Sequence, residues 1–162
     1  MISPPRFTIS GANNFDVVDL DIRMCSFLES VYKENVNIIN DDVRNLDLSK
    51  YTKIIGNLPY YITTELVTQF LLEAKNCKQM VFMIQTEAVN RFVDVAGKEY
   101  GPVSVLIHLL GNSKRLFSVK PGSFCPMPKC GSTVFRIDIN NLNEREKMVK
   151  VYKMTKSLFL NR

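Results

Sequence analysis

The sequence predicts an α/β fold in which a parallel sheet is covered by amphipathic helices. Short apolar runs rich in β-branched residues alternate with longer helix-like stretches, as in parallel α/β sheets. An apolar content of 46% is ample for one buried core. The 162 residues are enough for one compact domain and too few for two full ones.

Four of the short apolar runs, all in the first half of the chain, are expected to be strands. They cover residues 16–20, 37–39, 53–56 and 79–85. An amphipathic helix is expected over residues 64–74, with Thr63 or Thr64 as its N-cap. Four apolar side chains have the spacing of a helix face that packs on the sheet: Leu66, Val67, Phe70 and Leu71.

The second half is expected to add two helices and two further strands. Thr86 is expected to cap the first helix, and the second should cover residues 103–110 and end near Gly111. The two strands are expected at residues 116–119 and 133–139.

The end of the chain is expected to differ from the rest. A lysine-rich amphipathic helix is predicted over residues 143–160. We expect it to begin a second, small helical domain, so that the α/β domain covers residues 1–140 and the helical one begins within 141–162.

Composition excludes several classes of protein. The 21 Lys and Arg residues against 16 Asp and Glu give a net charge of +5, which favours a polyanionic partner. The four cysteines form no Cys-x-x-Cys pair and His108 lies in an apolar run, so no metal site is expected. Residues 1–7 do not resemble a secretion signal, and no stretch is long enough to span a membrane. An intracellular, reducing setting is therefore expected.

One short motif follows the strand expected at residues 53–56: Asn57, Leu58, Pro59 and Tyr60. Ligands of open parallel sheets bind beyond the carboxyl ends of the strands. Methyl transfer to an exocyclic aromatic amine requires that the amine be held and aimed at the donor. An Asn side-chain oxygen and a backbone carbonyl can accept its hydrogen bonds, and Tyr60 offers a stacking face for a flipped base. A plain turn with aromatic packing is the alternative interpretation.

A second aromatic loop lies in the proline-rich segment 121–131. Phe124 precedes Pro126 and Pro128, so a rigid stacking surface is expected there, with Lys129 placed to meet phosphate. The alternative is a loop that closes a hairpin with Phe124 simply buried.

Four ordered segments resemble the ribosomal RNA adenine N6,N6-dimethyltransferase family, in particular its small-subunit branch. They are residues 56–64, 85–91, 100–105 and 119–136. The resemblance implies a Rossmann-like methyltransferase fold, S-adenosylmethionine as the methyl donor, and dimethylation of two adjacent adenines in small-subunit rRNA.

The resemblance also implies roles for individual residues. Asn57 and the Leu58 carbonyl would hold the target amine, with Asn57 also near the cofactor, while Tyr60 and Phe124 would sandwich the base. Asp19 would bind the ribose of the cofactor, with Asp21 as the alternative residue for this role. Asp42 would bind the amino group of the cofactor's adenine, with Asp41 as the alternative.

Three departures from the family pattern are visible. The glycine-rich cofactor loop is absent, and a strand, loop and helix are missing at Val18/Asp19. The chain stops at Arg162, where family members continue into a basic helical domain. Tyr61 stands where the family usually has Asn.

The main hypothesis is therefore an rRNA dimethyltransferase, expected to be a monomer without membrane association. Bacterial cytoplasm and a eukaryotic organelle both remain compatible with it. The alternative is a non-catalytic RNA-binding ribosome assembly factor, in which the aromatic loops and the lysine-rich helix still hold RNA. A Rossmann-like enzyme acting on a small substrate is a third interpretation.

Overall fold

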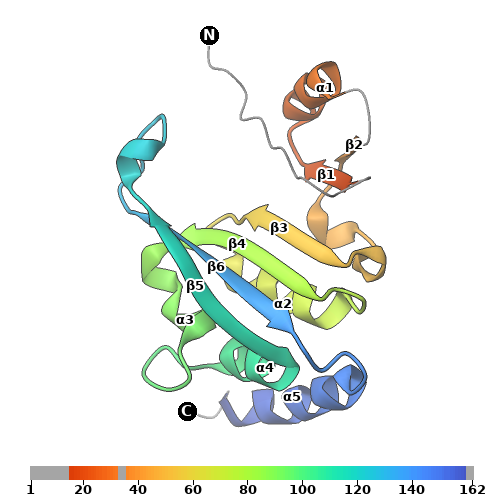
Figure 1. Ribbon diagram of the computed structural model, residues 1–162, viewed down its shortest axis with the longest axis vertical. Helices are drawn as coiled ribbons and strands as arrows, with labels where there is room; N and C mark the ends of the chain where they lie inside the picture. Colours follow the sequence, from red (N-terminus) through yellow and green to blue (C-terminus); the bar gives the residue numbers. More distant parts are fainter. Residues whose placement is uncertain (1–14, 33–35, 160–162) are drawn as a thin grey trace. The chain divides into compact units, whose positions relative to one another are not determined.

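The computed structural model describes residues 15–32 and 36–159 (Figure 1). The expectation of no secretion signal concerns residues 1–7, which lie outside the described residues. The chain divides into two compact units, Met1–Leu46 and Asp47–Arg162, and each is described by itself.

The first unit contains one helix and two paired strands. Strand β1 (Phe15–Asp19) pairs in parallel with β2 (Val36–Asn40), and helix α1 (Ile22–Val31) connects them. The strands were expected within one residue of these bounds. β1 continues without a break through Val18 and Asp19, so the residues on the two sides of the suspected gap form one strand here.

Helix α1 was not among the expected elements, although its sequence contains two signals. Asp21 is its N-cap and accepts a hydrogen bond from the Arg23 amide at 2.9 Å. Met24, Phe27 and Val31 have the spacing of one helix face, and all three are exposed in this unit.

The second unit is built on a four-stranded sheet of order β3-β4-β6-β5. Its strands are β3 (Lys53–Asn57), β4 (Gln79–Gln85), β5 (Gly111–Val119) and β6 (Ser132–Ile139). β3 and β4 pair in parallel, and β6 pairs antiparallel with both β4 and β5. β5 therefore runs in the same direction as β3 and β4, and the prediction of a parallel sheet is wrong for β6. The loop between β5 and β6 contains only a short 3-10 helix (Pro121–Ser123) and no crossover helix, so the two strands form an antiparallel hairpin.

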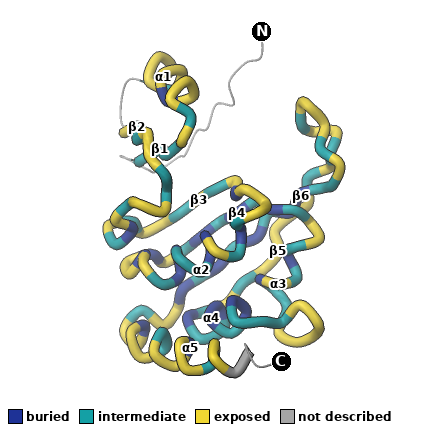
Figure 2. The backbone as a smooth tube through the Cα atoms, turned by 180° about the vertical axis from the view of Figure 1, so that it is seen from behind, coloured by how far each residue is buried: buried dark blue, intermediate teal, exposed yellow. Residues whose placement is uncertain are grey.

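Three helices cover one face of this sheet: α2 (Thr63–Glu73), α3 (Asn90–Val93) and α4 (Pro102–Leu110). A further helix, α5 (Arg145–Phe159), packs against α4. Figure 1 shows the first three behind the strands. Met80, Phe82 and Ile84 alternate along β4 and are fully buried, so they point to the face that the helices cover. Figure 2 shows further buried stretches, in dark blue, along α4. The expected apolar face of α2 is confirmed, because its four residues are all buried.

The other face of the sheet is covered by no helix of residues 47–159. Ile55 of β3 lies on it with 67% of its surface exposed, and Val81 of β4 is only half-buried. β3 is also an edge strand of this sheet. Apolar side chains on an open face and edge are unusual, because strand edges are normally protected.

The expected helix caps differ from the observed ones. Ile62 is the N-cap of α2, and Thr63 is instead its first residue. Thr86 begins a 3-10 helix (Thr86–Ala88) rather than capping it, and its hydroxyl lies 3.0 Å from that of Thr133. The expected end at Gly111 is confirmed.

Two further expectations concern metal-binding clusters of side chains and helices that could span a membrane. Among the described residues, no three His, Cys, Asp or Glu side chains are grouped so that they could hold a metal ion. No helix in the same part of the chain is long and apolar enough to cross a membrane.

Candidate active site

The loop of residues 57–60 leaves the carboxyl end of β3 and is fixed to the neighbouring strand. The Leu58 amide donates a hydrogen bond to the Met83 carbonyl of β4 at 3.1 Å. The Leu58 side chain is 6% exposed and anchors the loop in the core. Asn57 is exposed, and among the described residues its side-chain amide makes no hydrogen bond. Asn57 can therefore bind an external group.

The second half of the loop is fixed to helix α2. The Pro59 carbonyl accepts hydrogen bonds from the Thr63 hydroxyl at 2.8 Å and from the Ile62 amide at 3.3 Å. Within the described residues the Leu58 carbonyl has no such donor. Tyr60 keeps 45% of its surface exposed, so its ring remains available for stacking.

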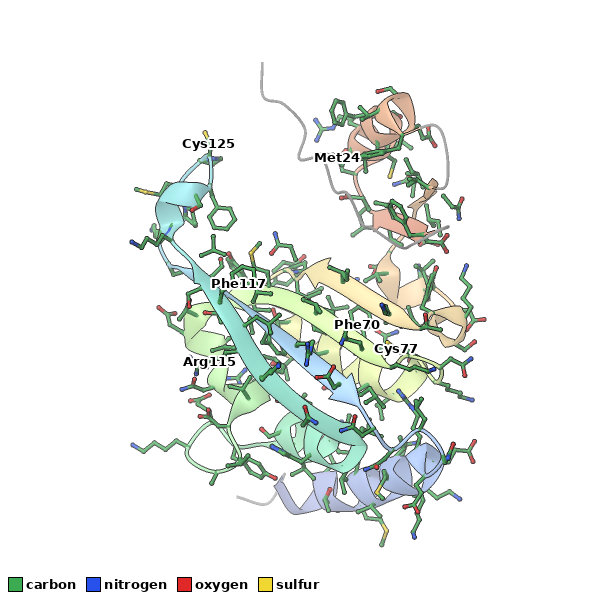
Figure 3. All side chains as sticks on the ribbon, viewed as in Figure 1. Met24, Phe70, Cys77, Arg115, Phe117 and Cys125 are labelled. Atoms are coloured by element: carbon green, nitrogen blue, oxygen red, sulfur yellow. The ribbon has the colours of Figure 1, made fainter. Side chains whose placement is uncertain are left out.

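The loop that contains Phe124 connects β5 to β6 at the same edge of the sheet. The Gln85 side chain donates to the Cys130 sulfur at 3.1 Å, and the Thr86 amide donates to the Gly131 carbonyl at 3.0 Å. Both contacts fix the loop base to the carboxyl end of β4. Phe124 is half-buried rather than buried, and Figure 3 shows Cys125 near the loop tip.

The two aromatic loops therefore flank β4. One follows β3, and the other precedes β6, on the opposite side of β4. Neighbouring strands are about 4.8 Å apart, so the strands that carry the loops are separated by roughly 10 Å. The structure brings Asn57, Tyr60 and Phe124 to one edge of one sheet, with a free amide and an exposed ring among them.

Thr63 and Gln85 were not identified as site residues from the sequence. Thr63 was expected as a helix cap, and its hydroxyl in fact fixes the Pro59 carbonyl. Gln85 lies in a segment that resembles the family, which was the only signal for it.

The acidic residues expected at a cofactor lie in the first unit. Asp19 ends β1, and its Oδ1 accepts the Asp21 amide at 2.8 Å. Asp42 follows the end of β2, so both residues lie at the carboxyl edge of the two-stranded sheet. Both Asp42 oxygens accept from the Arg44 guanidinium at 3.0 Å, and this hydrogen bonding lowers the pKa of Asp42 to about 2.

The competing aspartates have local roles. Asp21 caps α1 and pairs with Arg23 at 2.8 Å, and these hydrogen bonds lower its pKa. Asp41 accepts the Asn45 side-chain amide at 2.9 Å. Both contacts are typical of solvated turns.

The residues present fit a nucleotide cofactor only in part. Asp19 lies at a strand end, where a ribose could be bound, but Asp42 is occupied by Arg44. No glycine occurs between Gly11 and Gly56. A turn whose backbone amides closely approach a nucleotide needs glycine, so residues 12–55 lack the residue type that such a turn requires.

Comparison with known structures identifies the fold. A dimethyladenosine transferase from Plasmodium falciparum superposes with a TM-score of 0.69 at 22% identity, over 78% of this chain and 48% of that one. The chain therefore has a Rossmann-like methyltransferase fold, with a mixed sheet.

Sequence comparison then identifies the family. The ribosomal RNA adenine dimethylase model matches residues 9–162, so the chain belongs to this family. The ribosomal RNA small subunit methyltransferase A of Alkaliphilus oremlandii is 42% identical over 115 residues, which is 65% of this chain and 40% of that protein. The Helicobacter hepaticus protein of the same name is 32% identical over 166 residues, which is 88% of this chain and 58% of that protein.

This chain aligns with only part of each relative. The chain spans about half the length of the curated relatives it matches. The alignment with the Helicobacter hepaticus protein has 166 positions and includes 88% of this chain, which is about 143 residues. The alignment is therefore longer by about 23 positions than the part of this chain that it contains. About 23 positions within that alignment therefore have no counterpart in this chain.

Proposed function

We propose that the intact protein transfers methyl groups from S-adenosylmethionine to N6 of two adjacent adenines in small-subunit rRNA, and so supports ribosome biogenesis. The single observation that carries the proposal is the unpaired Asn57 amide at the carboxyl end of β3, beside the exposed Tyr60 ring. Family membership indicates adenine as the target. The proposed setting is the cytoplasm or an organelle with its own ribosomes, and the proposed form is a monomer.

The proposed work of the chain is to hold the base. The Asn57 side-chain oxygen and the Leu58 carbonyl accept the two N–H bonds of the target amine, which directs the nitrogen lone pair out of the ring plane. Tyr60 and Phe124 stack on the flipped base and exclude water from it. When bound, the cofactor supplies the methyl group.

The test uses the intact protein and small subunits that lack these methyl groups. Wild type is expected to incorporate methyl groups from labelled S-adenosylmethionine, and Asn57→Ala should lose at least about a hundredfold in rate, because one of two positioning acceptors is gone. Asn112→Ala is the matched control, since Asn112 is an exposed amide on β5. Equal rates for Asn57→Ala and wild type would contradict the proposal.

We also propose that the natural gene encodes a strand, a turn and a helix between Val18 and Asp19. Typical lengths of these elements add up to about 20 residues, and the unmatched positions of the Helicobacter hepaticus alignment are enough to include them. The exposed apolar face of α1, in the same unit as Val18 and Asp19, is explained if further elements are absent from that unit.

Sequencing the gene and its transcript across the codons for Val18 and Asp19 tests this. Additional codons with a glycine-rich turn are expected. A continuous reading frame without them would overturn the proposal and would favour the second candidate function, a non-catalytic RNA-binding assembly factor. The absence of a glycine-rich turn is the observation that favours that candidate. Calorimetric titration with S-adenosylmethionine then separates the two, because only the enzyme should bind it.

For the domains, we propose a boundary at 140/141, with residues 141–162 beginning a helical domain. Helix α5 packs against α4, and its Arg145 donates a hydrogen bond to the Leu71 carbonyl of α2. This packing supports a helical domain that is fixed to the α/β domain rather than tethered to it.

A further inference from the structure

Most of the net positive charge of the chain lies in the hairpin formed by β5 and β6. Residues 111–139 contain five Lys and Arg and one acidic residue, Asp138, which gives a net charge of +4. The remaining residues contain 16 Lys and Arg and 15 Asp and Glu, so they contribute only +1 of the total of +5. Figure 1 shows the connecting loop extending beyond the edge of the sheet.

Two of the five cations have partners within the fold. Arg136 pairs with Asp138 at 2.7 Å, and Arg115 donates a hydrogen bond to the Asn90 side chain. The other three are exposed lysines: Lys114, Lys120 and Lys129. None of the three forms an ion pair within 4 Å among the described residues, and only Lys114 lies close enough to Asp138 to contribute to lowering the pKa of that carboxyl.

An exposed aromatic residue of the same hairpin lies in one row with Asn57. The pairing Asn57↔Met83, Met83↔Val134 and Val134↔Phe117 crosses all four strands. Directly paired residues share a face, so Phe117 and Asn57 project to the same side of the sheet. Phe117 is 60% exposed.

A β-bulge produces this arrangement. Arg115 pairs with Phe135 and Phe117 pairs with Val134, so Leu116 is an extra residue between them. Residues two apart in a regular strand share a face, but the bulge turns Phe117 to the face opposite Arg115. Both side chains are labelled in Figure 3. Three strand spacings separate Phe117 from Asn57, about 14 Å.

We propose that the β5–β6 hairpin is a docking surface for single-stranded RNA, distinct from the pocket for the target base. The three lysines contact phosphates, and Phe117 stacks on a base of the nucleotides that flank the target. This inference rests on the proposed function, because it names the surface that holds the rRNA beside Asn57.

The test measures affinity of the intact protein for a fluorescent single-stranded RNA with two adjacent adenines, over a range of salt concentrations. The slope of log affinity against log salt changes by about 0.7 for each lost phosphate contact on single strands. Replacing all three hairpin lysines by Gln should therefore make this negative slope shallower by about 2. Phe117→Ala should weaken binding about tenfold without changing the slope.

The matched control replaces three exposed lysines at the amino ends of β3 and β4 by Gln: Lys53, Lys75 and Lys78. Its slope is expected to equal that of wild type. An unchanged slope in the hairpin variant, or a larger loss in the control variant, would overturn the inference. Circular dichroism checks that each variant is folded.

Failure of the docking surface is distinguishable from failure of the proposed function. If the hairpin substitutions do not change RNA affinity but the protein still transfers methyl groups, the proposed function stands and the docking surface is wrong. If RNA binding depends on the hairpin but no methyl group is transferred, the docking surface stands and the proposed function is wrong.

Discussion

The Thr63 hydroxyl donates a hydrogen bond to the Pro59 carbonyl at 2.8 Å. Thr63 is buried and belongs to helix α2, whereas Pro59 belongs to the loop that precedes it. A rigid helix thus holds the carbonyl next to the Leu58 carbonyl, which is proposed to accept the target amine. Thr63 is a positioning residue.

Replacing Thr63 by Val keeps the side-chain size but removes the donor. We expect kcat of the intact protein to fall about tenfold or more with a small change in KM for RNA, because loss of the hydrogen bond misplaces the acceptor by a fraction of an ångström. Thr63→Ser keeps the hydroxyl and should restore most of the activity. Equal kcat for the Val and Ser variants would contradict this role.

The four cysteines should differ in reactivity. Cys125 is exposed, whereas Cys77 is buried and burial raises the pKa of its thiol, so little thiolate forms there. In the folded protein an iodoacetamide time course should label Cys125 first and Cys77 only after unfolding in urea. Loss of the fast phase in Cys125→Ser, measured by mass spectrometry, verifies the assignment; fast labelling of Cys77 would disprove it.

Arg145 should be replaceable by an apolar residue of similar size. It is 5% exposed, its Nε and Nη1 have no hydrogen-bond partner among the described residues, and burial lowers the pKa of the guanidinium. Arg145→Met is expected to leave the free energy of unfolding unchanged or to raise it by about 1 kcal/mol, since a buried, incompletely paired charge is removed. Arg145→Ala should lower it by about 2 kcal/mol through lost packing. Urea unfolding curves test both, and equal destabilisation by Met and Ala would refute the expectation.

The ion pair of Asp42 and Arg44 should make the first unit sensitive to acid. The Arg44 guanidinium lowers the pKa of Asp42 from 3.8 to about 2. A carboxyl whose pKa is lower in the folded state stabilises that state above its unfolded pKa. The contribution is therefore complete above about pH 4 and is lost as the pH falls toward 2.

Carbon-detected NMR titration of the Asp42 carboxyl should give a midpoint near 2. In Arg44→Gln the midpoint should return toward 3.8, and the acid-induced loss of stability should shift to higher pH. A midpoint near 3.8 in wild type would show that the pair does not form in solution.

The central part of the fold could be predicted because its residues follow simple periodicities. The alternating burial of β4 and the helical spacing of α2 both result from one apolar face meeting the core. Both loops of the site were also predictable, since Pro59 and Pro126 interrupt regular structure where strands end. Their common location at one sheet edge follows from strand order.

Other features depend on interactions that no short window of sequence contains. The first half of β5 is polar and exposed, with Lys114 and Arg115, and it is a strand only because β6 pairs with it. The antiparallel direction of β6 is likewise set by the loop it follows. Thr63 looked like a cap because hydroxyl residues favour that position, but the adjacent Pro59 carbonyl provided a closer partner.

Gly111 connects α4 directly to β5, and a Cβ atom at this position would collide with the Asp138 carbonyl of β6. A larger residue would have to separate the two strands or shift their pairing by one position, and such a shift inverts every side chain of a strand. Phe117 would then leave the face it shares with Asn57, although it is six positions away in sequence. Random mutagenesis should consequently recover RNA-binding defects at Gly111, a residue with no chemistry of its own, as readily as at the lysines.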